Sequence, residues 1–178
     1  MQFKRIKSHT AFQGKILDVR QDRIEFENGL QADRELVEKH HEAAVIVALD
    51  EAERLIFVKQ YRYGAGKEML ELPAGLKDEG ETDEACAKRE LEEETGFSAG
   101  RLTKLFEYYA SPGYCTEKVT FFLAQQLTHT QQQLDEDEFL TIHRYSVEEA
   151  IEMIRSGAIT NGMTIAGIFA AKARFKMD

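Results

Sequence analysis

The feature that most restricts the possible folds is a continuous apolar run, AAVIVAL at residues 43–49. A strand with one wet face alternates apolar and polar residues, so an unbroken run indicates a strand that is buried on both faces. Such a strand needs cover on both sides of its sheet, which helices or a second sheet must provide. The run therefore predicts a layered domain with this strand near its centre.

Strands and helices are expected to alternate along the rest of this domain. Residues 54–61 predict a partner strand, and the glycines of residues 63–67 predict a loop. Thr82 suits a helix N-cap, and Gly96 suits a helix stop. Further strands are expected at 102–110, 118–124 and 139–145, and helices at 82–95, 147–155 and 161–175. This interleaving favours an α/β or α+β sandwich.

The N-terminal part of the chain predicts only β-structure. Residues 15–26 alternate over much of their length, and residues 31–38 follow as a second strand. Between them, Asn28-Gly29 is the sequence signal of a two-residue type I′ hairpin. We therefore expect a small antiparallel β-subdomain at residues 1–42, followed by the main domain at residues 43–178.

Composition narrows the class of ligand. With 32 acidic against 23 basic residues the net charge is −9, which disfavours nucleic acid as a partner. A phosphorylated small molecule would need a cation, or a local basic patch, between itself and such a chain. No apolar run is as long as a membrane span, and no secretory signal is visible. Two unpaired cysteines, Cys86 and Cys115, predict free thiols and a cytoplasmic location.

The helix expected at residues 82–95 carries a costly acidic face. Glu90, Glu93 and Glu94 stand at positions i, i+3 and i+4, so their carboxylates share one side of the helix. Like charges at this spacing repel, and the negative end of the helix dipole costs each acid about 0.3–1 kcal/mol more. The pattern alone leaves two interpretations open, a solvated acidic surface and a site for cations.

The residues that flank this face form a spaced pattern. Five residues separate Gly75 from Glu81, and seven more separate Glu81 from Arg89. Next come Glu90, aliphatic Leu91, the pair Glu93-Glu94, Gly96 and apolar Phe97. The whole pattern resembles the signature of Nudix hydrolases, G-x5-E-x7-R-E-U-x-E-E-x-G-U, in which U is an aliphatic or bulky apolar residue.

This resemblance implies a fold and an assembly. Nudix domains are α/β/α sandwiches around a mixed sheet, which would occupy residues 43–178. In the ADP-ribose pyrophosphatase branch of the family, a small antiparallel β-subdomain is exchanged between two subunits. Residues 1–42 would then serve dimerisation, and Arg34 could serve the partner's active site in a homodimer.

The resemblance also implies a metal site. The family's ligands are the helix glutamates and a backbone carbonyl just before the signature glycine. Here the implied ligands are Ala74, Glu90, Glu93 and Glu94. Mg²⁺, with Mn²⁺ as the alternative, suits such a set of oxygen ligands. Glu93 would also belong to the catalytic centre, where Arg89 would orient a neighbouring carboxylate.

Features outside the signature resemble the ADP-ribose pyrophosphatase branch. The implied substrate contacts are Arg34, Arg62, Ser111, Pro112, Gly113 and Glu117. Ser111-Pro112-Gly113 has an ordinary interpretation as well, because Ser-Pro-Gly makes turns in many proteins. Without the family, both arginines would be taken for surface residues.

A second acidic cluster, LDEDEF, occupies residues 134–139. Most acidic runs are solvated loops, but the branch places a mobile glutamate-bearing loop at this point of the chain. The resemblance therefore implies Glu136 as the general base that activates water. Glu138 is implied as an alternative base or as an auxiliary metal ligand.

The expected function is metal-dependent hydrolysis of ADP-ribose to AMP and ribose 5-phosphate by a homodimer that binds neither nucleic acid nor membranes. One alternative is a pyrophosphatase for another nucleotide sugar or a dinucleotide. Two others are a non-catalytic nucleotide sensor on the same fold and a structural acidic helix without metal. The complete glutamate set argues against the sensor, which has no need to keep a costly acidic face.

Overall fold

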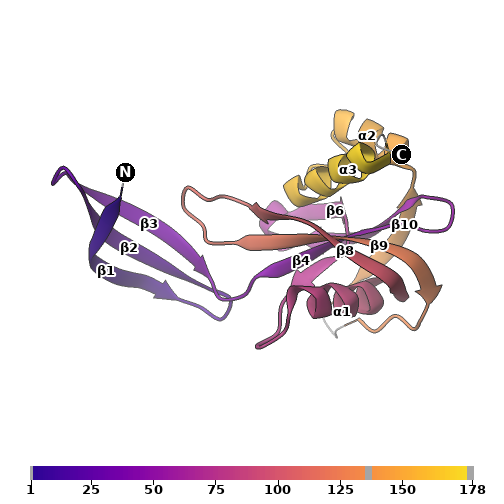
Figure 1. Cartoon of the computed structure of the whole chain (residues 1–178), viewed down its shortest axis with the longest axis horizontal. Coiled ribbons are helices and arrows are strands. Elements are labelled where there is room, and N and C mark those ends of the chain that lie inside the picture. The colour runs from indigo at the N-terminus through magenta and orange to yellow at the C-terminus, as the bar shows by residue number, and fades with distance from the viewer. Residues whose placement is uncertain (1, 135–137, 176–178) are drawn as a thin grey trace. The chain divides into compact units, whose positions relative to one another are not determined.

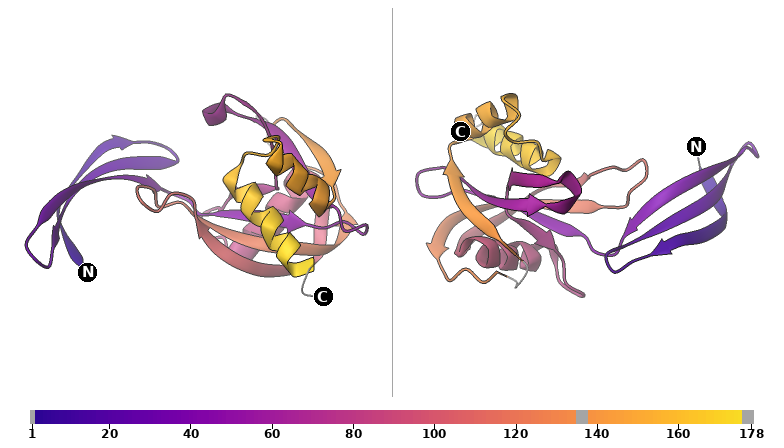
Figure 2. Two further views of the ribbon diagram at one scale, coloured as in Figure 1. Left: turned by 90° about the horizontal axis from the view of Figure 1, so that it is seen from above. Right: turned by 180° about the vertical axis from the view of Figure 1, so that it is seen from behind.

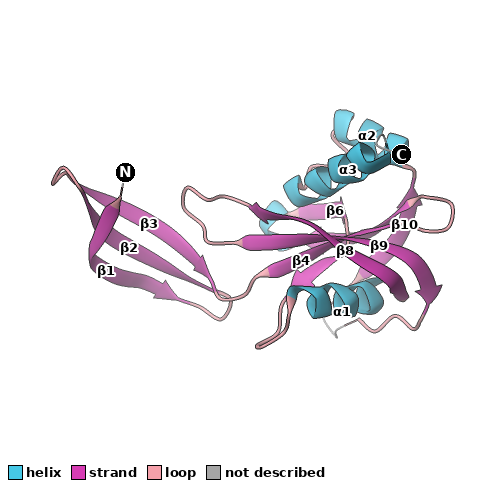
Figure 3. Ribbon diagram, viewed as in Figure 1, coloured by secondary structure: helices cyan, strands magenta, loops and turns pink. Residues whose placement is uncertain are grey.

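The computed structural model describes residues 2–134 and 138–175. The chain divides into two compact units, one of residues 1–42 with 109–118 and one of residues 43–108 with 119–178. All helices found in the described residues belong to the second unit, whereas the first is built of strands and loops (Figure 3). In the described part of the chain, no helix has the length and hydropathy needed to cross a bilayer.

The first unit is a three-stranded antiparallel sheet in the order β1-β2-β3. Its strands are β1 (Phe3–Gln13), β2 (Leu17–Phe26) and β3 (Gln31–Lys39). The expected type I′ turn at Asn28-Gly29 is wrong. Gly29 has φ 80°, but Asn28 is not among the residues with positive φ, which a type I′ turn requires at both central positions. The amide of Phe26 instead donates to Leu30 O at 2.9 Å, which makes a longer loop.

Residues 109–118 add a turn to this unit. The amides of Tyr114 and Cys115 both donate to the carbonyl of Ser111, at 3.1 and 2.8 Å. Val37 of β3 then donates to Tyr114 O at 2.7 Å and accepts from Thr116 N at 3.0 Å. The Ser-Pro-Gly turn is therefore attached to β3, the strand that carries Arg34.

The second unit is organised around β4 (Ala43–Ala48), which is buried on both faces as the apolar run predicts. Its even-numbered residues pack in one cluster with Leu91, and its odd-numbered residues pack in another with Ile168. These partners come from different helices, so each face of the strand has its own helical cover.

The second unit contains two sheets, and β4 lies inside one of them. One has the order β7-β4-β9-β8 and is mixed, because β4 is antiparallel to β7 and parallel to β9. The other has the order β10-β5-β6 and is antiparallel. The strands are β5 (Leu55–Arg62), β6 (Lys67–Glu71), β7 (Ala74–Leu76), β8 (Phe97–Tyr109), β9 (Lys118–His129) and β10 (Leu140–Tyr145).

The helices are α1 (Asp83–Thr95), α2 (Val147–Arg155) and α3 (Gly162–Phe175). Figure 1 shows α1 on one side of the sheets and α2 with α3 on the other, and the views of Figure 2 agree. Thr82 caps α1 by accepting from Ala85 N at 3.1 Å, and Gly96 ends the helix with φ 67°. The predicted α/β/α sandwich with a mixed sheet and a small N-terminal antiparallel sheet is confirmed.

Several boundaries differ from the sequence prediction. β8 begins at Phe97 rather than 102, because the left-handed Gly96 turns the chain from helix to strand without a linker. The expected loop at 63–67 contains a short 3₁₀ helix, Tyr63–Ala65. β7 was not predicted at all, since a three-residue strand shows no periodicity and forms through its pairing with β4.

Candidate active site

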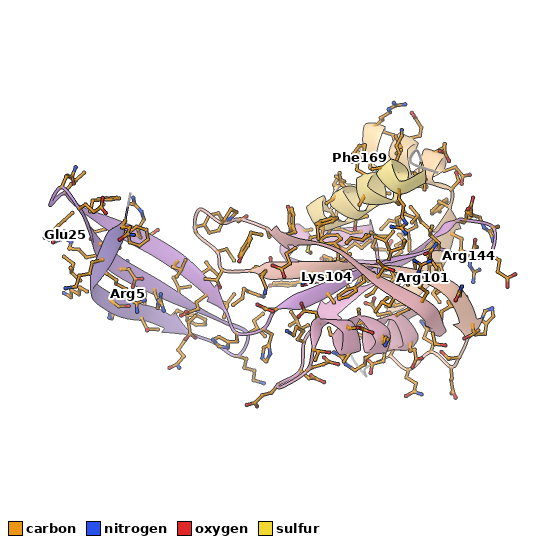
Figure 4. All side chains as sticks on the ribbon, viewed as in Figure 1. Arg5, Glu25, Arg101, Lys104, Arg144 and Phe169 are labelled. Carbon is orange, nitrogen blue, oxygen red and sulfur yellow. The ribbon has the colours of Figure 1, made fainter. Side chains whose placement is uncertain are left out.

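The three glutamates of α1 share a face but have different environments. Glu94 is 2% exposed and Glu90 is 8% exposed, whereas the side chain of Glu93 is 38% exposed. Asp83 anchors the start of the helix, since it accepts from Lys77 at 2.6 Å and from Thr120 at 2.9 Å. Lys104 of β8, labelled in Figure 4, lies 3.8 Å from the same carboxylate. The helix is therefore fixed to the sheet beneath it.

Arg89 links two of these glutamates to the loop before the helix. Its Nη1 donates to Glu90 Oε1 at 2.7 Å and to Glu93 Oε2 at 2.9 Å. Its Nε and Nη2 donate to the two oxygens of Glu81 at 3.1 and 2.9 Å, and Nη2 also reaches Leu76 O at 2.9 Å. The hydrogen bond with Glu81, more than any other contact, raises the pKa of Arg89. One guanidinium thus holds the carboxylates of Glu90 and Glu93 in position on the acidic face.

Glu81 acts as an anchor for this loop. Besides Arg89, its carboxylate accepts from the amide of Asp78 at 3.0 Å. The hydrogen bond from Arg89 lowers the pKa of Glu81, so this carboxylate stays charged and keeps its hold on the arginine.

Glu94 joins the helix to β7. Its Oε2 accepts from Ala74 N at 2.9 Å, which fixes the backbone whose carbonyl the sequence singled out. Burial, together with the nearby charges of Glu90 and Glu138, raises the pKa of Glu94 to about 8. The pKa of Glu90 is raised as well, chiefly by burial. Glu90, Glu94 and Glu138, hereafter the carboxylate cluster, are close enough for their charges to interact, and burial makes the charged forms of Glu90 and Glu94 unfavourable without a cation.

Gly75 makes room for this cluster. A Cβ at this position would lie 1.9 Å from the carboxyl carbon of Glu90 and 2.0 and 2.3 Å from its two oxygens. No side chain can occupy that space while the carboxylate does. The glycine of the motif therefore serves the close approach of a charged group to the β7 backbone.

The C-terminal end of α1 is capped by a segment to which the sequence assigned no role. Thr130 N donates to Gly96 O at 2.8 Å, and Gln133 N donates to Glu93 O at 3.1 Å. The side-chain amide of Gln132 donates to Glu94 O at 2.6 Å. No basic residue occupies the last turn, so these neutral donors satisfy its carbonyls.

The other predicted site residues fall into two groups. Arg62 lies in the second unit, where its charge acts on Glu94 and where it pairs with Glu71. The first unit holds Arg34, Ser111, Pro112, Gly113 and Glu117. Within that unit, Arg34 and Gly113 line one cavity of about 550 Å³, and Arg34 lies 6.0 Å from the ring centre of Phe26. Glu117 lies 3.9 Å from Lys39, and Glu136 is outside the described residues.

The chemistry of the donor set fits a divalent cation. Carboxylate and carbonyl oxygens are the ligands that Mg²⁺ and Mn²⁺ prefer, and a cation would stabilise the charged forms of the buried Glu90 and Glu94. Glu90 and Glu93 each turn one oxygen towards Arg89. Among the described residues, no group of three or more acidic, histidine or cysteine side chains is arranged as it would be around a bound metal ion.

Comparison with known proteins agrees with this geometry. A family model described as NUDIX domain matches residues 39–162, and one described as nucleoside diphosphate sugar hydrolase N-terminal domain matches residues 3–37. An ADP-ribose pyrophosphatase of Bacillus subtilis (strain 168) is 37% identical, over 93% of this chain and 90% of its own. An ADP-ribose pyrophosphatase of Mycobacterium tuberculosis (strain ATCC 25618 / H37Rv) is 36% identical, over 96% and 84%.

A solved structure extends the similarity to three dimensions. The protein described as an ADP compounds hydrolase superimposes with a TM-score of 0.89 at 26% identity, over 99% of this chain and 95% of its own. The acidic helix, the glycine that receives Glu90 and the mixed sheet thus occur together in a chain whose relatives match it almost end to end. This chain belongs to the Nudix hydrolase family.

Proposed function

We propose that this enzyme hydrolyses the pyrophosphate of ADP-ribose to AMP and ribose 5-phosphate and that it requires Mg²⁺, which Mn²⁺ can replace. The observation that carries the proposal is the acidic face of α1, with Glu90 seated on Gly75 and Glu94 bound to Ala74 N. Two relatives that match 93% and 96% of this chain are named ADP-ribose pyrophosphatases. Nucleotide-sugar pyrophosphate hydrolysis is the broader activity that these relatives support.

In the proposed site, Glu90, Glu93, Glu94 and the carbonyl of Ala74 hold the metal. When bound, divalent cations neutralise the pyrophosphate and lower the pKa of a bound water. Arg89 bridges Glu90 and Glu93 and holds both in place through two hydrogen bonds from Nη1. Such fixed orientation matters, because small misplacements of catalytic groups cost large factors in rate.

The general base in this proposal is Glu136, with Glu138 as the alternative or as an auxiliary ligand. The charge of Glu138 acts on both Glu90 and Glu94, which supports a place for it among the metal's ligands. Substrate binding is assigned to Arg62 beside the carboxylate cluster. The remaining proposed contacts are Arg34, Ser111, Pro112, Gly113 and Glu117 of the N-terminal unit.

Turnover of a substrate panel tests this proposal. ADP-ribose, nucleotide sugars, dinucleotides and nucleoside triphosphates would be incubated with the enzyme, with Mg²⁺ and with EDTA. We expect AMP from ADP-ribose, at the highest kcat/KM of the panel, and none in EDTA. Preference for another sugar would overturn the substrate alone, whereas binding without turnover of any compound would favour the nucleotide sensor.

We also propose that the N-terminal unit forms a homodimer. Several of its large apolar side chains are exposed in the single chain, among them Phe3 at 63%, Phe12 at 57% and Ile16 at 52%. A small three-stranded sheet buries little apolar surface of its own and is marginally stable alone. Exposed apolar patches commonly mark interaction sites. A second copy of the chain would cover these side chains.

Sedimentation equilibrium tests the dimer. The wild-type protein is expected at twice the chain mass of 20.3 kDa. Aspartates at Phe3 and Phe12 together should reduce it to the chain mass, because two charges on the contact surface oppose association. A wild-type monomer at micromolar concentration would contradict the proposal.

A further inference from the structure

Glu71, the last residue of β6, is a buried carboxylate outside the acidic helix. It is 2% exposed, and an isolated charge at that depth would be strongly unfavourable. Arg62 Nε and Nη2 both lie 2.7 Å from its Oε2, and Asn161 Nδ2 donates to its Oε1 at 2.8 Å. Both carboxylate oxygens are thus occupied, and one of them carries a charge-assisted fork from an arginine.

The partners of Glu71 are themselves held in place. Asn161 caps α3 by accepting from Thr164 N at 2.9 Å through Oδ1. Thr164, which is 2% exposed, accepts from Leu72 N at 3.1 Å. The start of α3 is therefore hydrogen-bonded to two consecutive residues of one segment, Glu71 and Leu72.

The same short segment reaches the catalytic helix. After Leu72, Pro73 O accepts from Ile46 N at 2.8 Å, and Ala74 N donates to Glu94 at 2.9 Å. Residues 71–74 are thus fixed at each step, with Arg62 attached at one end and Glu94 at the other. An arginine tied to Glu71 cannot move far without disturbing this series of hydrogen bonds.

We propose that Glu71 is a positioning residue that fixes Arg62 beside the carboxylate cluster, where the guanidinium binds the pyrophosphate of the substrate. The inference rests on the proposed function, since it takes Arg62 as a phosphate contact. A free arginine close enough to act on Glu94 would pair with that carboxylate and lose its place for substrate. The buried Glu71 holds the near side of the guanidinium, so its remaining donors are kept for a phosphate.

A double-mutant cycle tests this role. Binding of ADP-ribose to the full-length protein in EDTA, measured by calorimetry, reports on Arg62 without turnover and without metal. E71Q should weaken binding about tenfold in the wild-type background. In an R62A background it should change binding less than about twofold, because Glu71 acts only through Arg62. Equal factors in both backgrounds, or no effect in either, would overturn the proposal.

Glu68 offers a matched control on the same strand. It pairs with Lys59 at 2.6 Å, but its side chain is 61% exposed, so E68Q should leave ADP-ribose binding unchanged. Melting curves identify any loss of fold, and E71D, which keeps the charge but shortens the reach, replaces E71Q in the cycle if E71Q does not fold. If the wild-type protein neither binds ADP-ribose in EDTA nor hydrolyses it with Mg²⁺, the proposed substrate is wrong. If it hydrolyses ADP-ribose but binds it only with metal, the same cycle is measured as kcat/KM with Mg²⁺. If the wild-type protein binds ADP-ribose but E71Q weakens binding by the same factor in the R62A background, only the proposed role of Glu71 is refuted.

Discussion

The Glu93→Gln enzyme is expected to fold normally and to turn over substrate about 10²–10³-fold more slowly, the scale on which one charge-stabilising group acts. Glutamine has the size of glutamate, and its carbonyl can still accept the 2.9 Å hydrogen bond from Arg89. The loss is one negative charge, which the proposed metal site needs. The gain is relief of repulsion along the acidic face, so the melting temperature should stay the same or rise.

Glu92 gives this prediction its control. It lies on the same helix next to Glu93 but is exposed, so E92Q removes the same charge away from the acidic face. The rate of AMP formation and the melting temperature would be measured for both variants. If E93Q lost fold and activity together, the acidic face would be structural. If E92Q lost as much activity as E93Q, net charge rather than the site would be responsible.

Helical spacing explains why so much of the site could be predicted. Positions i, i+3 and i+4 of a helix share a face whatever surrounds them, so Glu90, Glu93 and Glu94 were placed together from local sequence alone. Which of them is buried depends on β7, a strand that only its pairing with β4 defines. The contrast between Glu94 and the more exposed Glu93 therefore follows from contacts that no local pattern contains.

The supporting hydrogen bonds were beyond the sequence for the same reason. Residues 131–133 predict only an exposed loop, yet Gln132 and Gln133 cap carbonyls of α1 about forty positions earlier, at Glu94 and Glu93. Glu71 and Asn161 are 90 positions apart in the chain. Such pairs have no period and no motif, and only the packing of α3 against the sheet brings them together.

The fold itself was more accessible where burial is continuous. The apolar run of β4 identified the central strand, because burial on both faces leaves no polar position to alternate. The Asn28-Gly29 signal marked the position of the loop correctly but not its turn type. Loop length and the twist of β2 and β3 decide the turn type. Short strands such as β6 and β7 depend on their partners and leave little trace in sequence.

Substitution of alanine for Gly75 is expected to remove most activity while the fold survives. The new methyl would overlap the carboxyl group of Glu90, at 1.9 Å from its carbon. The backbone of Gly75 is paired with Ala44 in the sheet and cannot withdraw, whereas the end of a glutamate side chain can. Glu90 would therefore leave its place and its 2.7 Å bond with Arg89. Displacement of a catalytic group by about 1 Å can cost about 10²-fold in rate.

Gly167 of α3 provides a comparison, because a side chain there would meet the packed core instead of a residue of the proposed metal site. A Cβ there would lie 2.4 Å from Leu72 Cδ1 and 3.2 Å from Val47 Cγ2, both in the packed core. Gly167→Ala should therefore lower stability by about 1–3 kcal/mol through overpacking. Melting curves and kcat measured on both variants should separate them, with the rate affected more at Gly75 and the melting temperature more at Gly167. A Gly75→Ala enzyme that kept its rate would show that Glu90 need not occupy the glycine's space, and the proposed arrangement of metal ligands would fail with it.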